Sequence, residues 1–375
     1  MAGEKRNVLL NPGPATTTNT VKMAQVVPDI CPREKEFADL LKNMRKDFVD
    51  IVHGDHRKFT SVPFCGSGTM MMDVCLNSLL PANKQVFIIN NGAYSGRAKE
   101  ICQCYNLPVV ELKLQYNERP ELNAIEQLLL THPDIHMIYT THNETGTGLL
   151  NPVSEIGALA HKHGKVFVVD TISTYGLLPI DIEKDNIDFC MASAQKGLAS
   201  MTGLSFIVGR KDLIEQSEQY PLRSFYCNLF KQYNCFEKTG EMQFTPPVQT
   251  VYATRRAIEE YFQEEEIPKY RRHMRVHQAI RKGLEKLGFQ ELLEEKLQSG
   301  LIATALYPND ANWDFMKIHD YCYERGFTIY PGKLFDTGYF RLCSLGAIDV
   351  PDIEAFFKVF EKALQTHNVK TPIKY

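Results

Sequence analysis

Short apolar runs alternate with helical patterns between about residues 60 and 210, and this alternation limits the folds that the chain can adopt. The runs are rich in β-branched and aromatic residues, and several are apolar nearly throughout, as expected for strands buried on both faces. They are VFIIN (86–90), VVELKL (109–114), IHMIYTT (135–141), KVFVVD (165–170), IDFCMAS (187–193) and LSFIVGR (204–210). The helical patterns between them include TMMMDVCLNSLL, ELNAIEQLLLTH and PVSEIGALAHKHG. This order predicts βαβ units, and hence an α/β fold with a mostly parallel sheet between helices.

The pattern changes after about residue 246. Two long, charged, amphipathic helical patterns come first, VQTVYATRRAIEEYFQEEE and IPKYRRHMRVHQAIRKGLEKLG. The short strand-like runs LIATALYP, FTIYP and YFRLCS follow, with a helix between them, and the chain closes on the amphipathic DIEAFFKVFEKALQTH. We therefore expect a second, smaller α+β domain.

Composition excludes several classes of protein. The 375 residues are 44% hydrophobic and 23% charged, which argues against disorder, coiled coil and collagen. A net charge of −3 gives no electrostatic footprint for nucleic acid or an anionic membrane. No apolar run approaches the roughly 18 residues that span a bilayer, and the start, MAGEKRNVLLNPGP, does not resemble a signal peptide. We expect a cytoplasmic protein.

Ten cysteines are spread along the whole chain. The sequence contains no C-x-x-C, and the pair Cys102 and Cys104 has no second pair with which to form a zinc site. A disulfide framework is typical of short secreted chains rather than of a chain this long. We expect reduced thiols and no bound metal.

A glycine-rich turn, CGSGT at 65–69, opens one of the predicted helices. Two glycines permit close backbone approach, and the free N–H groups of a helix N-terminus attract an anion. The hydroxyls of Ser67 and Thr69 would complete a phosphate-binding cup. The turn is not a dinucleotide fingerprint, because Met71 stands where a third glycine is needed, and it lacks the lysine of a P-loop. A tight turn that only caps a helix explains this segment equally well.

Charged and polar residues stand at the ends of three predicted strands. Asp170 ends KVFVVD, where a desolvated carboxylate needs a partner such as a protonated heterocyclic nitrogen or the amides of the next turn. Lys196, in SAQKG (193–197), follows IDFCMAS, and partial burial would lower its pKa and favour Schiff-base chemistry, although most lysines are surface charges. The polar loop TTHNETGTG (140–148) follows a third strand, and its His142 alone is more typical of a structural histidine.

These features follow one another in a fixed order: phosphate cup, polar loop, strand-end Asp170, strand-end Lys196. A pyridoxal-phosphate site needs this set, because the phosphate binds at a helix N-terminus, a carboxylate pairs with the pyridine nitrogen, and a lysine binds the aldehyde carbon. The residues themselves therefore predict a pyridoxal-phosphate enzyme.

The chain resembles the class V aminotransferase family of fold-type I pyridoxal-phosphate enzymes along essentially its whole length. The blocks that carry the resemblance are NPGPAT (11–16), NGAYSGR (91–97), HNETGTG (142–148), VVDTIST (168–174) and SAQKG (193–197). The resemblance implies a large pyridoxal-phosphate domain with a mostly parallel, seven-stranded sheet. It also implies a division into residues 15–260 for that domain and residues 1–14 with 261–375 for the smaller one.

The resemblance also implies roles for individual residues. Lys196 is similar to the Schiff-base lysine, Asp170 to the partner of the pyridine nitrogen, and Arg341 to the arginine that binds the acid group of the substrate. Thr245 matches a residue that reaches the phosphate from the partner subunit, which implies a homodimer with shared active sites. The positions that match cofactor contacts are Ser67, Gly68, Thr69, Tyr94, Thr145, Asp170, Gln195, Lys196 and Thr245. Arg33 is a second candidate for anion binding, for which a surface ion pair is the simpler explanation.

Within the family, the blocks NPGPATTT (11–18), CGSGT (65–69), HNETGTG (142–148), QFTPPVQ (243–249) and IYPGKL (329–334) are similar to those of transaminases acting on 2-aminoethylphosphonate. They imply amino transfer from 2-aminoethylphosphonate to pyruvate in the breakdown of phosphonates, giving phosphonoacetaldehyde and L-alanine. An alanine–glyoxylate or serine–pyruvate aminotransferase with the same cofactor site is the main alternative.

Three other classes fit the residues less well. A cysteine desulfurase usually has a histidine before the lysine, where this chain has Gln195. No cysteine stands out as a persulfide carrier, and Cys343, close to Arg341, is better explained by core packing. A nicotinamide dehydrogenase would need the missing third glycine. A non-catalytic binding module would not need Lys196.

Overall fold

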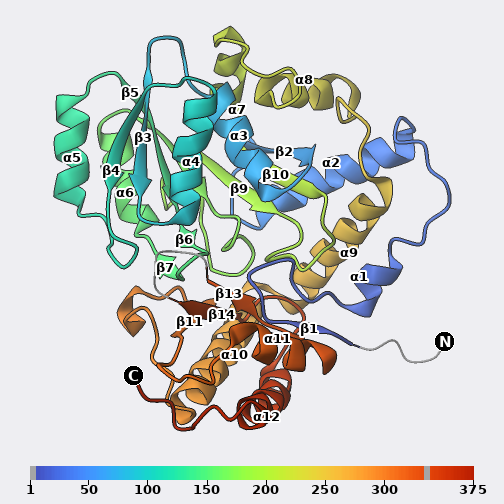
Figure 1. Ribbon diagram of the computed structural model, residues 1–375. Coiled ribbons are helices and arrows are strands. Elements are labelled where there is room, and N and C mark those ends of the chain that lie inside the picture. The colour runs from blue at the N-terminus through green and yellow to red at the C-terminus, as the bar shows by residue number, and fades with distance from the viewer. Residues whose placement is uncertain (1–5, 333–337) are drawn as a thin grey trace.

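A seven-stranded sheet forms the centre of the computed structural model, which describes residues 6–332 and 338–375 (Figure 1). Its strands stand in the order β2-β10-β9-β8-β5-β3-β4, and β10 alone runs antiparallel to its neighbours. The strands are β2 (Phe59–Cys65), β3 (Gln85–Asn90), β4 (Val109–Lys113), β5 (Ile135–Thr141), β8 (Val166–Asp170), β9 (Phe189–Ser193) and β10 (Leu204–Arg210). The expected α/β class with a mostly parallel sheet is confirmed.

Helices cover both faces of this sheet. The chain moves along the sheet in one direction through α3 (Gly68–Ser78) and α4 (Ala93–Cys104), and in the other through α5 (Leu122–Thr131) and α6 (Val153–Lys162). Because parallel crossovers are right-handed, the reversal places the two pairs of helices on opposite faces. In agreement, α3 packs against α4 and α5 against α6.

The six strands expected from apolar runs are all present, and β2 is the strand that those runs did not indicate. β2 contains Pro63, which cannot donate a ladder hydrogen bond and is tolerated in a sheet mainly at an edge. β2 is such an edge, with β10 on one side only. On its other side, Gln232 of α8 (Leu229–Thr239) donates a hydrogen bond of 2.9 Å to the Pro63 carbonyl and so protects the edge.

The C-terminal part has its own small sheet and core. Strands β11 (Ile302–Leu306), β14 (Tyr339–Cys343) and β13 (Tyr330–Pro331) pair antiparallel in that order. The N-terminal strand β1 (Val8–Leu9) pairs parallel with β12 (Phe327–Thr328), which brings the start of the chain to this part. Fully buried side chains such as Phe340, Phe356 and Phe360 form a core separate from that of the large sheet.

The remaining elements complete the connections. Their bounds are α1 (Asn19–Met23), α2 (Lys35–Asp50), β6 (Asn143–Glu144), β7 (Leu149–Leu150), α7 (Lys211–Gln216), α9 (Val248–Glu264), α10 (Glu266–Lys286), α11 (Phe315–Glu324) and α12 (Val350–Thr366). Among the described residues, no helix has the length and apolar character to cross a membrane. The predicted domain boundaries near residues 14 and 260 remain a proposal, and residues 1–5 of the predicted small domain lie outside the described residues.

Candidate active site

The carboxyl ends of the parallel strands bring the predicted site residues to one edge of the sheet. β8 ends at Asp170, and β9 ends shortly before Lys196. β2 runs parallel to β9, because β10 is antiparallel to both, so its end at Cys65 and the glycine turn lie at the same edge. Ligands of open α/β sheets bind at this edge.

The glycine turn presents an open helix N-terminus. Ser67 is the N-cap residue of α3, its side chain is exposed, and it makes no capping hydrogen bond. The first amides of a helix have no acceptor within the helix, so these groups are available to an anion. Gly68 is required by close packing, since a Cβ there would lie 2.9 Å from Cγ2 of Ile172. This contact fixes the turn against the segment that follows Asp170.

Asp170 is a buried carboxylate with few partners. Its Oδ1 accepts a hydrogen bond of 2.9 Å from the Ile172 N–H, and its Oδ2 accepts one of 3.4 Å from the Tyr139 hydroxyl. Burial raises the pKa of Asp170 to about 6, because these bonds and the nearby Lys196 offset only part of the cost of desolvation. A cation facing the carboxylate would favour its charged form.

Lys196 is partly covered by the N-terminal loop. Gly13 has a φ of +129° and lies against the lysine chain, so that a Cβ there would lie 3.0 Å from Cγ of Lys196. The Ala15 N–H donates a hydrogen bond of 2.8 Å to the Gln195 carbonyl and holds the loop in place. Burial lowers the pKa of Lys196 to about 8, although Asp170 opposes the shift. At pH 7 about a tenth of this amine is therefore neutral and nucleophilic, far more than for a lysine with the ordinary pKa of 10.5.

Tyr94 places an aromatic ring beside the lysine, with its centroid 5.6 Å from Nζ of Lys196. Glu144, which is fully buried in the polar loop, fixes the start of α4. It accepts hydrogen bonds from the N–H groups of Tyr94 (3.1 Å) and Ser95 (2.8 Å) and from the Ser95 hydroxyl (2.6 Å). Glu144 was not among the predicted site residues, although its place in the crowded polar loop was a signal.

Arg97 lies on α4 beside both the turn and the ring. Its Nη1 donates a hydrogen bond of 3.0 Å to Oγ1 of Thr69, and its Cζ lies 4.7 Å from the centroid of the Tyr94 ring. Arg97 belongs to the NGAYSGR block but was not among the predicted site residues.

Arg341 extends from β14 of the small sheet to the polar loop. Its Nη1 donates to the Thr145 carbonyl (3.0 Å) and its Nη2 to the Pro331 carbonyl (3.1 Å). The residue is only 7% exposed, and its Nε has no partner among the described residues. A buried donor that lacks an acceptor is costly, so this arginine is suited to an anion that arrives with a ligand.

The other predicted residues differ in how the chain places them. Thr145 is buried, and the side-chain oxygen of Gln195 accepts a hydrogen bond of 2.6 Å from the Ser193 hydroxyl. Thr245 is exposed, and its carbonyl lies 3.6 Å from Sγ of Cys65. Arg33 forms an ion pair of 2.7 Å with Glu241 at the surface.

His142 and the cysteines do not act as charged groups here. Burial lowers the pKa of His142 to about 4, and its Nδ1 lies 3.0 Å from the Thr174 hydroxyl, which suits a neutral structural histidine. All ten cysteines are free thiols. Cys343 is fully buried, and burial raises the pKa of its thiol to about 12. The predicted block 329–334 ends in residues 333 and 334, which lie outside the described residues.

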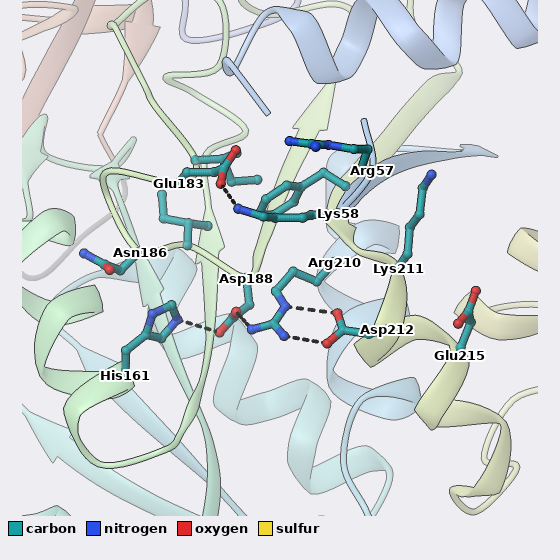
Figure 2. A pocket seen from close by; sticks show the side chains of 13 residues that line it. Arg57, Lys58, His161, Glu183, Asn186, Asp188, Arg210, Lys211, Asp212 and Glu215 are labelled. Carbon is teal, nitrogen blue, oxygen red and sulfur yellow. Dashed lines mark hydrogen bonds and ion pairs between the residues drawn. The ribbon is translucent and has the colours of Figure 1, made fainter. Parts of the chain in front are cut away.

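A cavity of about 690 Å³ lies at the opposite edge of the sheet, where β9 begins (Figure 2). His161 and Arg210 both point at the buried Asp188, at 3.1 and 3.2 Å, and Lys58 bonds to Glu183 at 2.6 Å. Each basic side chain that lines the cavity has a partner in the chain. We infer that this network stabilises the end of the sheet where β9 begins. We place the candidate active site at the opposite end, where the parallel strands have their carboxyl ends.

The site combines an anion cup, an amine whose pKa is lowered by burial, a buried carboxylate, an aromatic platform and a buried arginine. A ligand with a phosphate group, a flat heterocyclic ring and a reactive carbonyl would match the first four of these groups. The buried arginine, whose Nε lacks an acceptor among the described residues, is left for a second, acidic ligand.

The chain is similar over nearly its whole length to known proteins. The family model described as aminotransferase class-V matches residues 19–326. A bifunctional phosphonoacetaldehyde hydrolase/aminoethylphosphonate transaminase of Clostridioides difficile is 35% identical over 96% of this chain, which spans 56% of that protein. A 2-aminoethylphosphonate–pyruvate transaminase of Lysinibacillus sphaericus is 32% identical over 96% of this chain and 98% of its own. The solved ureidoglycine–glyoxylate aminotransferase of Bacillus subtilis shares the fold, with a TM-score of 0.89, 17% identity, and coverage of 98% of this chain and 95% of its own.

Proposed function

The chain belongs to the class-V aminotransferase family, and we propose that it transfers the amino group of 2-aminoethylphosphonate to pyruvate, giving phosphonoacetaldehyde and L-alanine. The observation that carries the choice of substrates is the likeness, at 32–35% identity over nearly the full chain, to proteins named for this reaction. The site agrees with it chemically, because it contains a lysine whose pKa is lowered by burial and a buried arginine with a free donor.

The residues fit pyridoxal phosphate, the cofactor of this family. The uncapped start of α3 with Ser67, Gly68 and Thr69 would bind its phosphate, and the ring of Tyr94 would lie against its ring. Asp170 supports the fit most directly: a buried carboxylate whose pKa is raised by desolvation gains a partner in a protonated ring nitrogen. Thr145 and Gln195 are proposed as further cofactor contacts.

Pyridoxal phosphate, when bound, supplies an aldehyde that condenses with amines and a ring that withdraws electrons from the neighbouring carbon. Lys196 would hold that aldehyde until the amino group of the donor takes its place. The freed Nζ, as a neutral amine, would then accept the proton from the amine-bearing carbon of 2-aminoethylphosphonate. The lowered pKa of Lys196, about 8 in the free protein, favours this neutral form.

Asp170 keeps the ring nitrogen protonated, and the Ile172 N–H and Tyr139 hydroxyl keep the carboxylate in place. Arg341 binds the acid group of each substrate in turn, phosphonate in one half of the reaction and the carboxylate of pyruvate in the other. Two carbonyl oxygens hold its Nη atoms, so the guanidinium is oriented before the substrate arrives.

We also propose a homodimer with shared active sites. On one chain Thr245 is exposed, and it follows a cluster of aromatic side chains in which Tyr226 stacks on Phe244 at 4.5 Å and Phe225 is 71% exposed. Large apolar side chains gathered at a surface are typical of an interface. A partner that covers them would bring its own Thr245 to the phosphate cup.

The division into domains is likewise a proposal: residues 15–260 as the large domain, and residues 1–14 with 261–375 as the small one. The two hydrophobic cores and the pairing of β1 with β12 support it. The ten free thiols support a reducing, cytoplasmic location.

A single-turnover experiment tests the proposed function. Protein loaded with pyridoxal phosphate is mixed with 2-aminoethylphosphonate in the absence of pyruvate. We expect one equivalent of phosphonoacetaldehyde per site together with loss of the visible absorption of the loaded protein. Pyruvate added next should restore the absorption and release one equivalent of alanine. Lys196→Ala protein should give neither product, and wild-type protein that releases no phosphonoacetaldehyde would refute the proposal.

A further inference from the structure

Arg97 is a basic side chain of the site to which the proposed reaction assigns no role. It is half-buried, and across residues 6–332 and 338–375 no carboxylate forms an ion pair with it. The hydrogen bond that positions it is the 3.0 Å contact from Nη1 to Oγ1 of Thr69. Partly desolvated charges are usually paired, so a cation left in this state indicates an anion that arrives with a ligand.

The contact with Thr69 shows where that anion binds. Thr69 is the second residue of α3, directly at the open helix N-terminus. Because its oxygen accepts a hydrogen bond from Arg97, its own O–H proton is available for a different acceptor. An anion bound in the cup would then accept hydrogen bonds from the Thr69 hydroxyl and from the helix amides. The Thr69 hydroxyl would stand between this anion and the positively charged Arg97 guanidinium.

A phosphate bound in the cup needs a nearby cation, such as the Arg97 guanidinium, to balance its charge. A phosphate monoester carries a charge of about −1.5 to −2 at neutral pH. A helix N-terminus offsets only about half a charge. Lys196 lies at the carbonyl end of the site, next to Asp170, and Arg341 is held by carbonyls of the polar loop and β13. Arg97 is the arginine that bonds to the cup itself.

We propose that Arg97 is a positioning residue that neutralises the phosphate of bound pyridoxal phosphate through Thr69. Its guanidinium also packs on the Tyr94 ring, 4.7 Å from the centroid, and so connects the phosphate end of the site with the platform for the ring. This inference rests on the proposed function, because it needs the phosphorylated cofactor, and it adds the residue that makes the site select that form.

The test compares two ligands that differ only in the phosphate. The cofactor is removed from wild-type, Arg97→Gln and Arg97→Lys proteins, and Kd is measured for pyridoxal phosphate and for pyridoxal by absorbance titration. We expect Arg97→Gln to raise the Kd for pyridoxal phosphate by about 10- to 100-fold, as for loss of a charge-assisted hydrogen bond. Its Kd for pyridoxal should change by less than about twofold, since that ligand lacks the charge.

Arg97→Lys keeps the charge and should recover much of the affinity for pyridoxal phosphate. If Arg97→Gln does not fold, Arg97→Lys still tests the inference. Lysine lacks the planar guanidinium, so this variant should bind pyridoxal phosphate more weakly than wild type and pyridoxal equally well. Arg325→Gln is the matched control. Arg325 also stacks on a tyrosine, with Cζ 3.5 Å from the Tyr321 ring, and donates to the Tyr321 carbonyl at 2.9 Å, but it lies at the C-terminal end of α11, away from the cup. Both ligands should bind this control as they bind wild type.

Three results would overturn the inference while leaving the proposed function in place. Equal losses for pyridoxal phosphate and pyridoxal would mean that Arg97 acts only through the Tyr94 ring. Unchanged binding of both would mean that it serves neither. A change confined to KM for 2-aminoethylphosphonate would make it a substrate residue. Wild-type protein that binds neither ligand would instead overturn the proposed function, and this inference with it.

Discussion

Burial shifts the two central ionisable groups of the site in opposite directions. The pKa of Asp170 is raised to about 6 and that of Lys196 is lowered to about 8, in each case because the charged form is desolvated. At pH 7 both groups are still mostly charged, but the neutral form of each is more populated than at its ordinary pKa, and the charge of each favours the charge of the other. The chain thus holds a ready nucleophile and a carboxylate that gains from a protonated ring.

Replacing Asp170 by asparagine tests the carboxylate with little change in shape. In Asp170→Asn the side-chain amide oxygen would still accept a hydrogen bond from the Ile172 N–H, so the fold should be retained. Loss of the charge removes the group that keeps the ring nitrogen protonated, and we expect kcat to fall by about 10²- to 10³-fold. Steady-state kinetics on protein saturated with cofactor measure this, and a fall of less than about threefold would contradict the role.

The pKa of Lys196 predicts how fast free protein captures its cofactor. Only the neutral amine attacks an aldehyde, so the capture rate should rise about tenfold per pH unit below pH 8 and level off above it. Stopped-flow absorbance measures the rate. Because Asp170 raises the pKa of Lys196, the midpoint should move to lower pH in Asp170→Asn. A midpoint near 10.5, the ordinary value for lysine, would disprove the effect of burial.

Arg341→Lys tests whether one arginine serves both substrates. Lysine keeps the positive charge but cannot offer two parallel N–H donors, and it cannot keep both carbonyl contacts. We expect kcat/KM to fall by about 10- to 100-fold for 2-aminoethylphosphonate and for pyruvate alike. Arg33→Lys, at a surface ion pair, is the control and should leave both unchanged. If kcat/KM fell for only one of the two substrates, the acid group of the other substrate would bind to a different residue.

At the scale of elements, apolar runs identified the strands, and the residues that end them identified much of the site. β8 is apolar up to Asp170, so the carboxylate stood out against its own strand. β2 was missed because Pro63 and its polar residues break the pattern, although an edge strand tolerates both. Glu144 and Arg97 were missed for another reason: their partners, at the start of α4 and at Thr69, are distant in sequence.

Glu144 connects two elements, the polar loop and α4. Its carboxylate accepts from two amides and one hydroxyl, whereas the glutamine of Glu144→Gln would offer only one oxygen and would direct an NH₂ group at a donor. We expect the free energy of unfolding to fall by about 1–3 kcal/mol. Urea unfolding measures this, with Glu155→Gln, in the exposed first turn of α6, as control. Equal stability of the two variants would argue against the carboxylate as the anchor of Tyr94.

At the scale of the whole molecule, residues of the small sheet complete the site where they contact the polar loop. Arg341 and Tyr339 of β14 bond to the Thr145 and Gly146 carbonyls at 3.0 Å each. Neither contact was predictable from local pattern, because in the sequence Arg341 is an ordinary residue of a short strand. Its role came from family resemblance and remains a proposal, while its burial and its free Nε are observations.

The proposed dimer makes a prediction at the same scale. Phe225→Asp places a charge in the exposed aromatic cluster and should reduce the mass in sedimentation from twice 42.8 kDa to 42.8 kDa. The monomer should also lose cofactor on gel filtration, since each cup would lack the partner's threonine. The control variant Tyr323→Asp changes a different exposed aromatic residue, which lies on α11, and should stay dimeric. A wild-type protein of 42.8 kDa in solution would contradict shared active sites.

The central claim concerns the amino donor, and a comparison of donors tests it most directly. Alanine formation from pyruvate is measured with 2-aminoethylphosphonate and with serine, and glycine formation from glyoxylate is measured with alanine. We predict that kcat/KM for 2-aminoethylphosphonate exceeds that of either rival donor by about a hundredfold or more, because the chain is similar over nearly its full length to proteins named for transfer from this donor. A larger kcat/KM for serine, or for alanine with glyoxylate, would assign the chain to the alternative aminotransferase and contradict the claim.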